Sequence, residues 1–123
     1  MTTALIIEDN DDNMALISFI LKSGAYDLIE ARTGEQGVDL ALQHRPDVII
    51  LDIQLPGIDG FEVLKRIRAS EIDGSIPIIA MTSFAMTGDR EKLLASGCDG
   101  YIEKPIDPAR VVQQIKAVIE KKS

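Results

Sequence analysis

Acidic side chains and a lysine stand at the ends of separate apolar runs in this chain. Glu8 and Asp9 follow the first run, Asp52 ends another, and Lys104 with Pro105 follows the last. If these runs are parallel strands, their carboxyl ends lie along one edge of a sheet, beside the point where strand order reverses. The spacing therefore predicts that Asp9, Asp52 and Lys104 converge on one cleft.

A cluster of carboxylates in a cleft requires a compensating cation. Two carboxylates ~5 Å apart repel by roughly 3 kcal/mol at an effective dielectric of about 20. A divalent ion offsets this charge, and hard oxygen ligands favour Mg²⁺ over a softer metal. Lys104 provides a second positive group. The residues therefore predict a magnesium site with a lysine beside it.

The reaction that best uses these groups is phosphoryl transfer. It requires an in-line nucleophile and cations on the phosphoryl oxygens, and little else from the protein. Asp52 can be the nucleophile, because carboxylates form aspartyl-phosphate intermediates. Thr82 ends the fourth apolar run, so its hydroxyl can donate to a phosphoryl oxygen. A β-branched residue is also common in strands, and residue type alone leaves both roles open for Thr82.

Five short apolar runs alternate with helical patterns along the chain. Three of them lack the polar alternation of a half-exposed strand, as expected for strands covered by helices on both faces, and residues 28–31 and 100–102 are weaker runs. The runs are residues 4–7, 28–31, 48–51, 76–81 and 100–102. Apolar residues at helical spacing fill the segments between and after them. This pattern predicts an α/β fold with right-handed crossovers and a doubly wound, five-stranded parallel sheet in three layers.

Local chemistry marks three helix starts. Asn10 is a suitable N-cap before an acidic first turn. Thr33 with Gln36 three residues later fits a capping box, and Asp107 followed by Pro108 fits an N-cap with proline at the first helical position. We therefore expect helices to begin immediately after Asn10, Thr33 and Asp107.

Composition limits the class of protein. The 123 residues are close to the usual size of one domain, 46% of them are apolar, and no linker-like stretch interrupts them. A net charge of −7 argues against direct binding of nucleic acid. No apolar run is long enough to span a bilayer and no signal peptide is evident, so we expect a cytoplasmic chain without membrane insertion. Cys98 is alone and His44 lies in a polar turn without ligand partners, so neither has a predicted role.

Four segments carry a resemblance to a known family. Residues 6–10, 51–60, 81–83 and 101–105 match, in order and spacing, the motifs of response-regulator receiver domains of two-component signalling. The chain resembles this family over its whole length, which implies one receiver domain at residues 1–123 with a flavodoxin-like sheet of strand order 2-1-3-4-5. A weaker resemblance of residues 84–89 is to stand-alone receivers of bacterial cell-cycle pathways and to receivers of hybrid kinases.

The resemblance implies a role for each acidic residue of the cleft. Asp52 would accept a phosphoryl group from a phosphohistidine on a histidine kinase or a histidine phosphotransfer protein. Glu8 and Asp9 would form the acidic pair. Mg²⁺ would be held directly by Asp9, Asp52 and the backbone carbonyl of Gln54, and through water by Glu8.

The resemblance also implies a conformational switch. Thr82 matches the family's switch hydroxyl, Lys104 its phosphate-binding lysine and Tyr101 its aromatic switch, and a cis peptide would precede Pro105. Phosphorylation would draw Thr82 and Lys104 inward, and Tyr101 would rotate to fill the space. The readout would be a docking surface for a downstream protein on the last helices and strand, with onward phosphotransfer as the other possible output. On residue type alone, Tyr101 is a half-buried strand aromatic.

Three other functions fit parts of this pattern. A haloacid-dehalogenase-type phosphatase places a second Asp two residues after its nucleophile, where this chain has Gln54. A flavodoxin-like binding module needs a glycine- and hydroxyl-rich phosphate loop, and the acidic residues 8–12 would instead repel a phosphate. A receiver that had lost phosphorylation would not keep the complete set of groups. We therefore predict a phosphoacceptor signalling domain rather than an enzyme, and the closeness of Met1 to the first run favours a stand-alone chain over an excised receiver.

Overall fold

Strands and helices alternate throughout the protein. The computed structural model describes residues 2–70, 76–83 and 87–122, without the side chains of residues 87–90. The strands are β1 (Thr3–Ile7), β2 (Asp27–Ala31), β3 (Val48–Asp52), β4 (Ile78–Thr82) and β5 (Gly100–Glu103). The helices are α1 (Asp11–Ser23), α2 (Gly34–His44), α3 (Gly60–Ser70), α4 (Thr87–Ala95) and α5 (Pro108–Lys122). Each of the five predicted apolar runs lies in or overlaps a strand.

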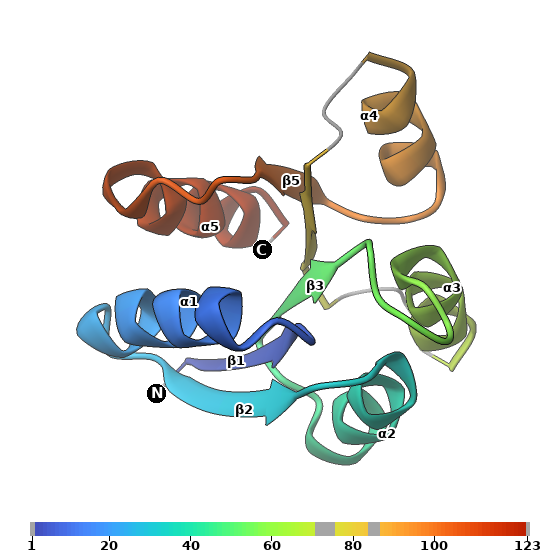
Figure 1. Ribbon diagram of the computed structural model, residues 1–123, viewed down its shortest axis with the longest axis horizontal. Helices are drawn as coiled ribbons and strands as arrows, with labels where there is room; N and C mark the ends of the chain where they lie inside the picture. Colours follow the sequence, from blue (N-terminus) through green and yellow to red (C-terminus); the bar gives the residue numbers. More distant parts are fainter. Residues whose placement is uncertain (1, 71–75, 84–86, 123) are drawn as a thin grey trace.

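The strands form one parallel sheet with the order β2-β1-β3-β4-β5. Figure 1 shows α1 and α5 on one side of this sheet and α2 and α3 on the other. Each face has its own apolar core, because alternate residues of a strand point to opposite faces. Leu5 and Leu51 pack with residues of α2, α3 and α4, whereas Ile6 and Ile50 pack with residues of α1 and α5. The predicted three-layer, doubly wound fold and its strand order are confirmed.

The register of the sheet brings the predicted cleft residues to one edge. Ile7 is paired with Leu51, and Leu51 is paired with Ala80. The residues that follow these three positions therefore leave the sheet at nearly the same height. Because β1 is followed in sequence by β2 on one side and has β3 on its other side, strand order reverses beside it. This is the position at which doubly wound sheets bind ligands.

Helix caps form where local chemistry predicts them. Asn10 accepts a hydrogen bond from the backbone N–H three residues later at 2.9 Å, and Asp107 accepts one from the N–H two residues later at 3.0 Å. Thr33 accepts from the backbone N–H of Gln36 at 3.1 Å. In a capping box, the Gln36 side chain would accept a hydrogen bond from the backbone N–H of the N-cap residue Thr33. Here it accepts instead from the N–H of Arg32, at 2.8 Å. That bond satisfies the backbone immediately after β2.

One strand begins later than the apolar pattern indicates. The run starts at residue 76, but β4 starts at Ile78. Pro77 has no N–H to donate to a strand ladder, although its carbonyl accepts a hydrogen bond from Ile49 at 2.9 Å. At its other end, the strand extends to Thr82, which is the last residue of β4.

Candidate functional site

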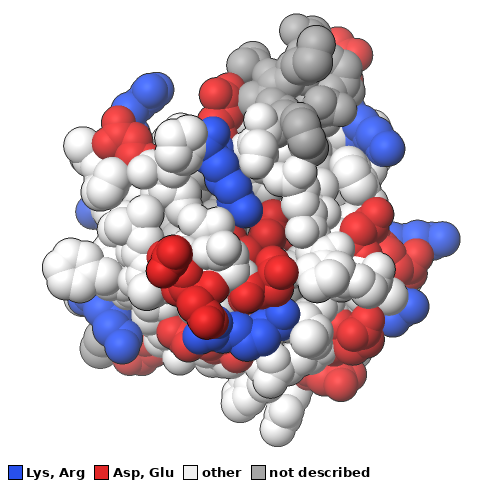
Figure 2. Space-filling view, viewed as in Figure 1, with Lys and Arg blue, Asp and Glu red and all other residues white. Residues whose placement is uncertain are grey.

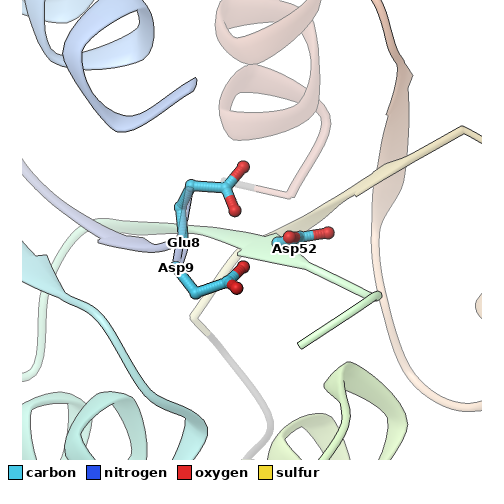
Figure 3. A group of neighbouring side chains, drawn as sticks. All are labelled: Glu8, Asp9 and Asp52. Carbon is cyan, nitrogen blue, oxygen red and sulfur yellow. The ribbon is translucent and has the colours of Figure 1, made fainter. Parts of the chain in front are cut away.

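Three carboxylates meet at the carboxyl edge of the sheet. Glu8 and Asp9 follow β1, and Asp52 is the last residue of β3. One oxygen from each carboxylate lies within 4.8 Å of the other two, and Figure 3 shows the three groups extending toward a common space. Glu8 and Asp52 are buried, with 0% and 2% exposure, while Asp9 is exposed. The cluster therefore opens to solvent on the Asp9 side.

Lys104 reaches this cluster from the segment after β5. Its Nζ atom is 3.2 Å from Asp52 Oδ1 and 3.3 Å from Glu8 Oε1. The backbone positions it, because the Lys104 N–H donates to the carbonyl of Thr82 at 2.9 Å. The peptide bond to Pro105 is cis, as the resemblance to receiver domains implies. In the space-filling view, basic and acidic side chains meet in a hollow near the centre of this face (Figure 2).

Burial changes the pKa of Glu8. Its pKa is raised from 4.5 to about 7, chiefly by loss of solvent and also by the hydrogen bond and charge of Asp52. Lys104 and the N–H of Asn10 act in the opposite direction, but they are the weaker influences on this pKa. Among the described residues, nothing makes a hydrogen bond to Glu8 Oε1, and its contact with Lys104 is an ion pair only. The carboxylates outnumber the lysine, so the cluster retains an excess of negative charge.

These features fit a hard divalent cation. The donor set consists of carboxylate oxygens, a buried oxygen lacks a hydrogen bond among the described residues, and Asp9 leaves one side open to water. Mg²⁺ favours this combination, since it binds through a few carboxylates and keeps several waters. The residues present are therefore compatible with the metal that the sequence predicts.

The other predicted residues surround the cluster at different depths. Thr82 is buried at the end of β4, with 3% exposure, on the strand next to that of Asp52. Tyr101 is half-buried on β5 and packs against the core beneath α2, α3 and α4. The backbone N–H of Gln54 donates to Asp52 Oδ1 at 3.0 Å. His44, for which no role was predicted, is exposed at the end of α2.

One contact near the site was missing from the sequence-based interpretation. Ser83 Oγ donates to the side-chain oxygen of Gln54 at 2.9 Å. The family resemblance implied a role only for the backbone carbonyl of Gln54, and no role was predicted for the Ser83 side chain. The available signal was position, because both residues come just after strand ends at the same edge of the sheet. The weaker resemblance of residues 84–89 concerns segments and side chains outside those that the structure describes.

A groove of about 690 Å³ lies beside β5, away from the carboxylate cluster. Its apolar lining includes Leu94 of α4, Tyr101 of β5 and Val118 of α5, and Lys104 is at its margin. Lys104 therefore contributes to the carboxylate cluster and to this surface. No helix within the described ranges is long and apolar enough to cross a membrane.

The fold and the cluster together define a class of protein. The model of the response regulator receiver domain matches residues 4–116, and the chain belongs to this family. It is 42% identical to the polar-differentiation response regulator DivK of Brucella anthropi over 117 residues, which cover 95% of each chain. It is equally similar, at 42% over 117 residues, to DivK of Brucella ovis.

Solved structures agree with this assignment. The chemotaxis response regulator CheY4 of Vibrio cholerae has a TM-score of 0.91 at 26% identity, over 96% of this chain and 98% of that one. The receiver domain of the sensor histidine kinase PA1611 of Pseudomonas aeruginosa has a TM-score of 0.88 at 35% identity, over 97% and 98% of the two chains. That receiver domain has a magnesium ion coordinated in its active site cleft.

Proposed function

We propose that this protein is a phosphoacceptor response regulator in which Asp52 receives the phosphoryl group. The observation that carries the proposal is the convergence of three carboxylates with Lys104, whose Nζ atom is 3.2 Å from Asp52 Oδ1. A histidine kinase or a histidine phosphotransfer protein supplies the phosphoryl group. In the transfer, the bond from phosphorus to the histidine nitrogen breaks and a bond to a carboxylate oxygen of Asp52 forms.

The acidic cluster is the proposed magnesium site. Asp9, Asp52 and the backbone carbonyl of Gln54 are the direct ligands, and Glu8 acts through water. The bound ion supplies charge compensation, which allows the anionic phosphoryl group to approach a cluster of carboxylates. The magnesium in the Pseudomonas receiver domain, which is 35% identical to this chain, supports the assignment.

Lys104 and Thr82 are the proposed partners of the transferred group. Lys104 already lies between Glu8 and Asp52, and a small displacement brings its ammonium to a phosphoryl oxygen. The Thr82 hydroxyl donates to another oxygen. Phosphorylation adds strong acceptor oxygens and negative charge to Asp52, so it attracts both groups inward. This chain assists its own phosphorylation and dephosphorylation in that way, without a separate substrate turnover.

The inward movement is the proposed switch. Thr82 lies beside β5, where its register partner is Glu103, and Tyr101 lies two residues earlier on that strand. Tyr101 rotates into the space that Thr82 leaves, which reshapes the groove between α4, β5 and α5. A downstream protein recognises this surface. We further infer that residues 1–123 act as a single receiver domain, with docking or onward phosphotransfer as output.

The test is phosphorylation by acetyl phosphate with Mg²⁺. Wild-type protein should be labelled at Asp52, and Asp52→Asn, which removes the nucleophile but keeps its shape, should lose the label. Asp59→Asn is the matched control, because Asp59 lies in the following loop and caps α3, a role that Asn also fulfils. A chelator should prevent labelling. Equal labelling of Asp52→Asn, or labelling without metal, would show that the assignment is wrong.

A further inference from the structure

A side-chain hydrogen bond joins the two loops that border Asp52. Ser83 Oγ donates to Gln54 Oε1 at 2.9 Å, and 29 positions separate the residues in sequence. Gln54 lies in the loop after β3 and Ser83 in the segment after β4. Both residues are exposed, so the bond crosses the solvent side of the site.

Each end of this bond is one step from a residue of the proposed switch. Gln54 is tied to the nucleophile, since its backbone N–H donates to Asp52 Oδ1 at 3.0 Å. Ser83 is joined by one peptide bond to Thr82. The hydrogen bond therefore connects the backbone that holds Asp52 to the backbone that carries the switch hydroxyl.

We propose that the Ser83–Gln54 hydrogen bond is a latch that opposes the movement of Thr82 toward a phosphoryl group on Asp52. This inference rests on the proposed function and adds a positioning role for two residues to it. Thr82 cannot move far without Ser83. The bond is at 2.9 Å, so displacement of Ser83 away from Gln54 lengthens and weakens it. The tie between Gln54 and Asp52 limits how far Gln54 follows.

The latch sets how readily phosphorylation switches the protein. A single hydrogen bond of this kind changes an equilibrium between about twofold and tenfold. A ligand that binds the switched arrangement has an apparent affinity reduced by the fraction of molecules that reach that arrangement. Loss of the latch therefore increases the apparent affinity for a phosphoryl-like ligand by the same factor.

The test is a double-mutant cycle with beryllofluoride as the phosphoryl-like probe, at saturating Mg²⁺ and with binding followed by NMR. Ser83→Ala and Gln54→Ala should each lower the apparent Kd about two- to tenfold. The double variant should show no more than either single change, because both remove the same bond. Ser83→Thr, which keeps a hydroxyl, should retain the wild-type Kd. Ser23→Ala is the matched control, since its hydroxyl donates to the Phe19 carbonyl within α1 at 3.0 Å.

Mg²⁺ affinity in the absence of beryllofluoride distinguishes loss of the latch from a general distortion of the loop. A distorted loop would change this affinity, whereas loss of the latch alone would not. We expect this affinity to be the same in wild type and Ser83→Ala. An unchanged beryllofluoride Kd in both single variants, or effects that add in the double variant, would refute the latch. Failure of wild-type protein to bind beryllofluoride would instead overturn the proposed function, and the latch with it.

Discussion

The two ends of the β-sheet carry opposite arrangements of charge. At the carboxyl end, three carboxylates form a cluster, and Lys104 pairs with two of them, Glu8 and Asp52. At the amino end, the carboxylate of Asp99 is paired with both Arg68 and Lys122. The carboxyl end therefore has an excess of negative charge within a few ångströms, whereas the Asp99 carboxylate at the other end has two cationic partners.

The amino end is also saturated with hydrogen bonds. Asp99 Oδ2 accepts from Arg68 Nη2 at 2.8 Å and from the backbone N–H of Ile78 at 2.9 Å, while Lys122 donates to both carboxylate oxygens at 3.0 and 3.1 Å. Arg68 donates further to the carbonyls of Gly97 at 2.9 Å and Ile76 at 2.8 Å. These bonds connect the end of α3, the start of β4, the segment before β5 and the end of α5.

The difference shows where this fold is stabilised and where it is prepared for a ligand. Groups that satisfy one another, such as Asp99 and Arg68, gain little from an added ion. Groups that repel, such as Glu8 and Asp52, lower stability until a cation or a proton compensates them. Sites of this kind are where proteins place chemistry at the expense of stability.

Loss of Arg68 should give the largest change in stability. Arg68→Ala should lower the free energy of unfolding by about 2–3 kcal/mol, because it leaves two partly buried carbonyls without this donor and weakens the compensation of Asp99. Urea denaturation measures the effect. Arg66→Ala is the matched control two positions earlier in α3, because its side chain pairs with Glu62 at 2.9 Å on the exposed surface of that helix. It should cost less than about 0.5 kcal/mol, and an equal loss in both variants would contradict the contrast between the ends.

Titration of Glu8 should give the next largest effect. Its pKa of about 7 in the folded protein exceeds the ordinary value of 4.5, so between these pH values the folded state binds more protons than the unfolded state. This contribution to stability is complete below pH 4.5 and is lost as the pH rises through 7. Glu8→Gln should remove this pH dependence, because its side chain stays neutral. At pH 8 with chelator present, the variant should therefore exceed wild type in free energy of unfolding by on the order of 2 kcal/mol. Denaturation curves across this range measure the difference, and parallel pH profiles would refute it.

Magnesium should stabilise the carboxyl end alone. At ten times its Kd, Mg²⁺ should raise the free energy of unfolding by about 1.4 kcal/mol. Asp9→Asn should lose most of this gain, while Asp12→Asn, which removes an exposed acid of α1 outside the cluster, should keep it. Arg68→Ala should also keep the gain despite its lower stability. Loss of the magnesium effect in Arg68→Ala would mean that the two ends are energetically coupled.

The smallest effect should be on the phosphorylation rate of Thr82→Ala. The variant keeps the nucleophile, the acidic cluster and Lys104, so its rate with acetyl phosphate should remain within tenfold of wild type, less than about 1.4 kcal/mol of barrier. Its switch should fail, because the phosphoryl group gains no differential contact with Thr82. NMR signals of Tyr101 and α5 should shift much less with beryllofluoride than in wild type. Full wild-type shifts would show that the signal leaves the site by another route.

Much of the fold was predictable because it depends on local patterns. The apolar runs gave four of the strands within one residue of their ends, and the N-caps at Asn10, Thr33 and Asp107 are those that the sequence indicates. Pro77 delayed the start of β4, since a missing N–H acts on strand pairing and not on hydropathy. The positions of Glu8 and Asp52 followed from the strand ends.

The sequence by itself therefore determined the alternation of elements, the helix starts and which residue types reach the carboxyl edge of the sheet, because each depends on neighbours in the chain. Tertiary structure alone decided the burial that raises the pKa of Glu8, the bond between Gln54 and Ser83, and the pairing of Asp99 with Arg68. Burial and side-chain pairing depend on residues distant in sequence, and the apolar pattern does not specify which distant polar groups come within hydrogen-bond distance.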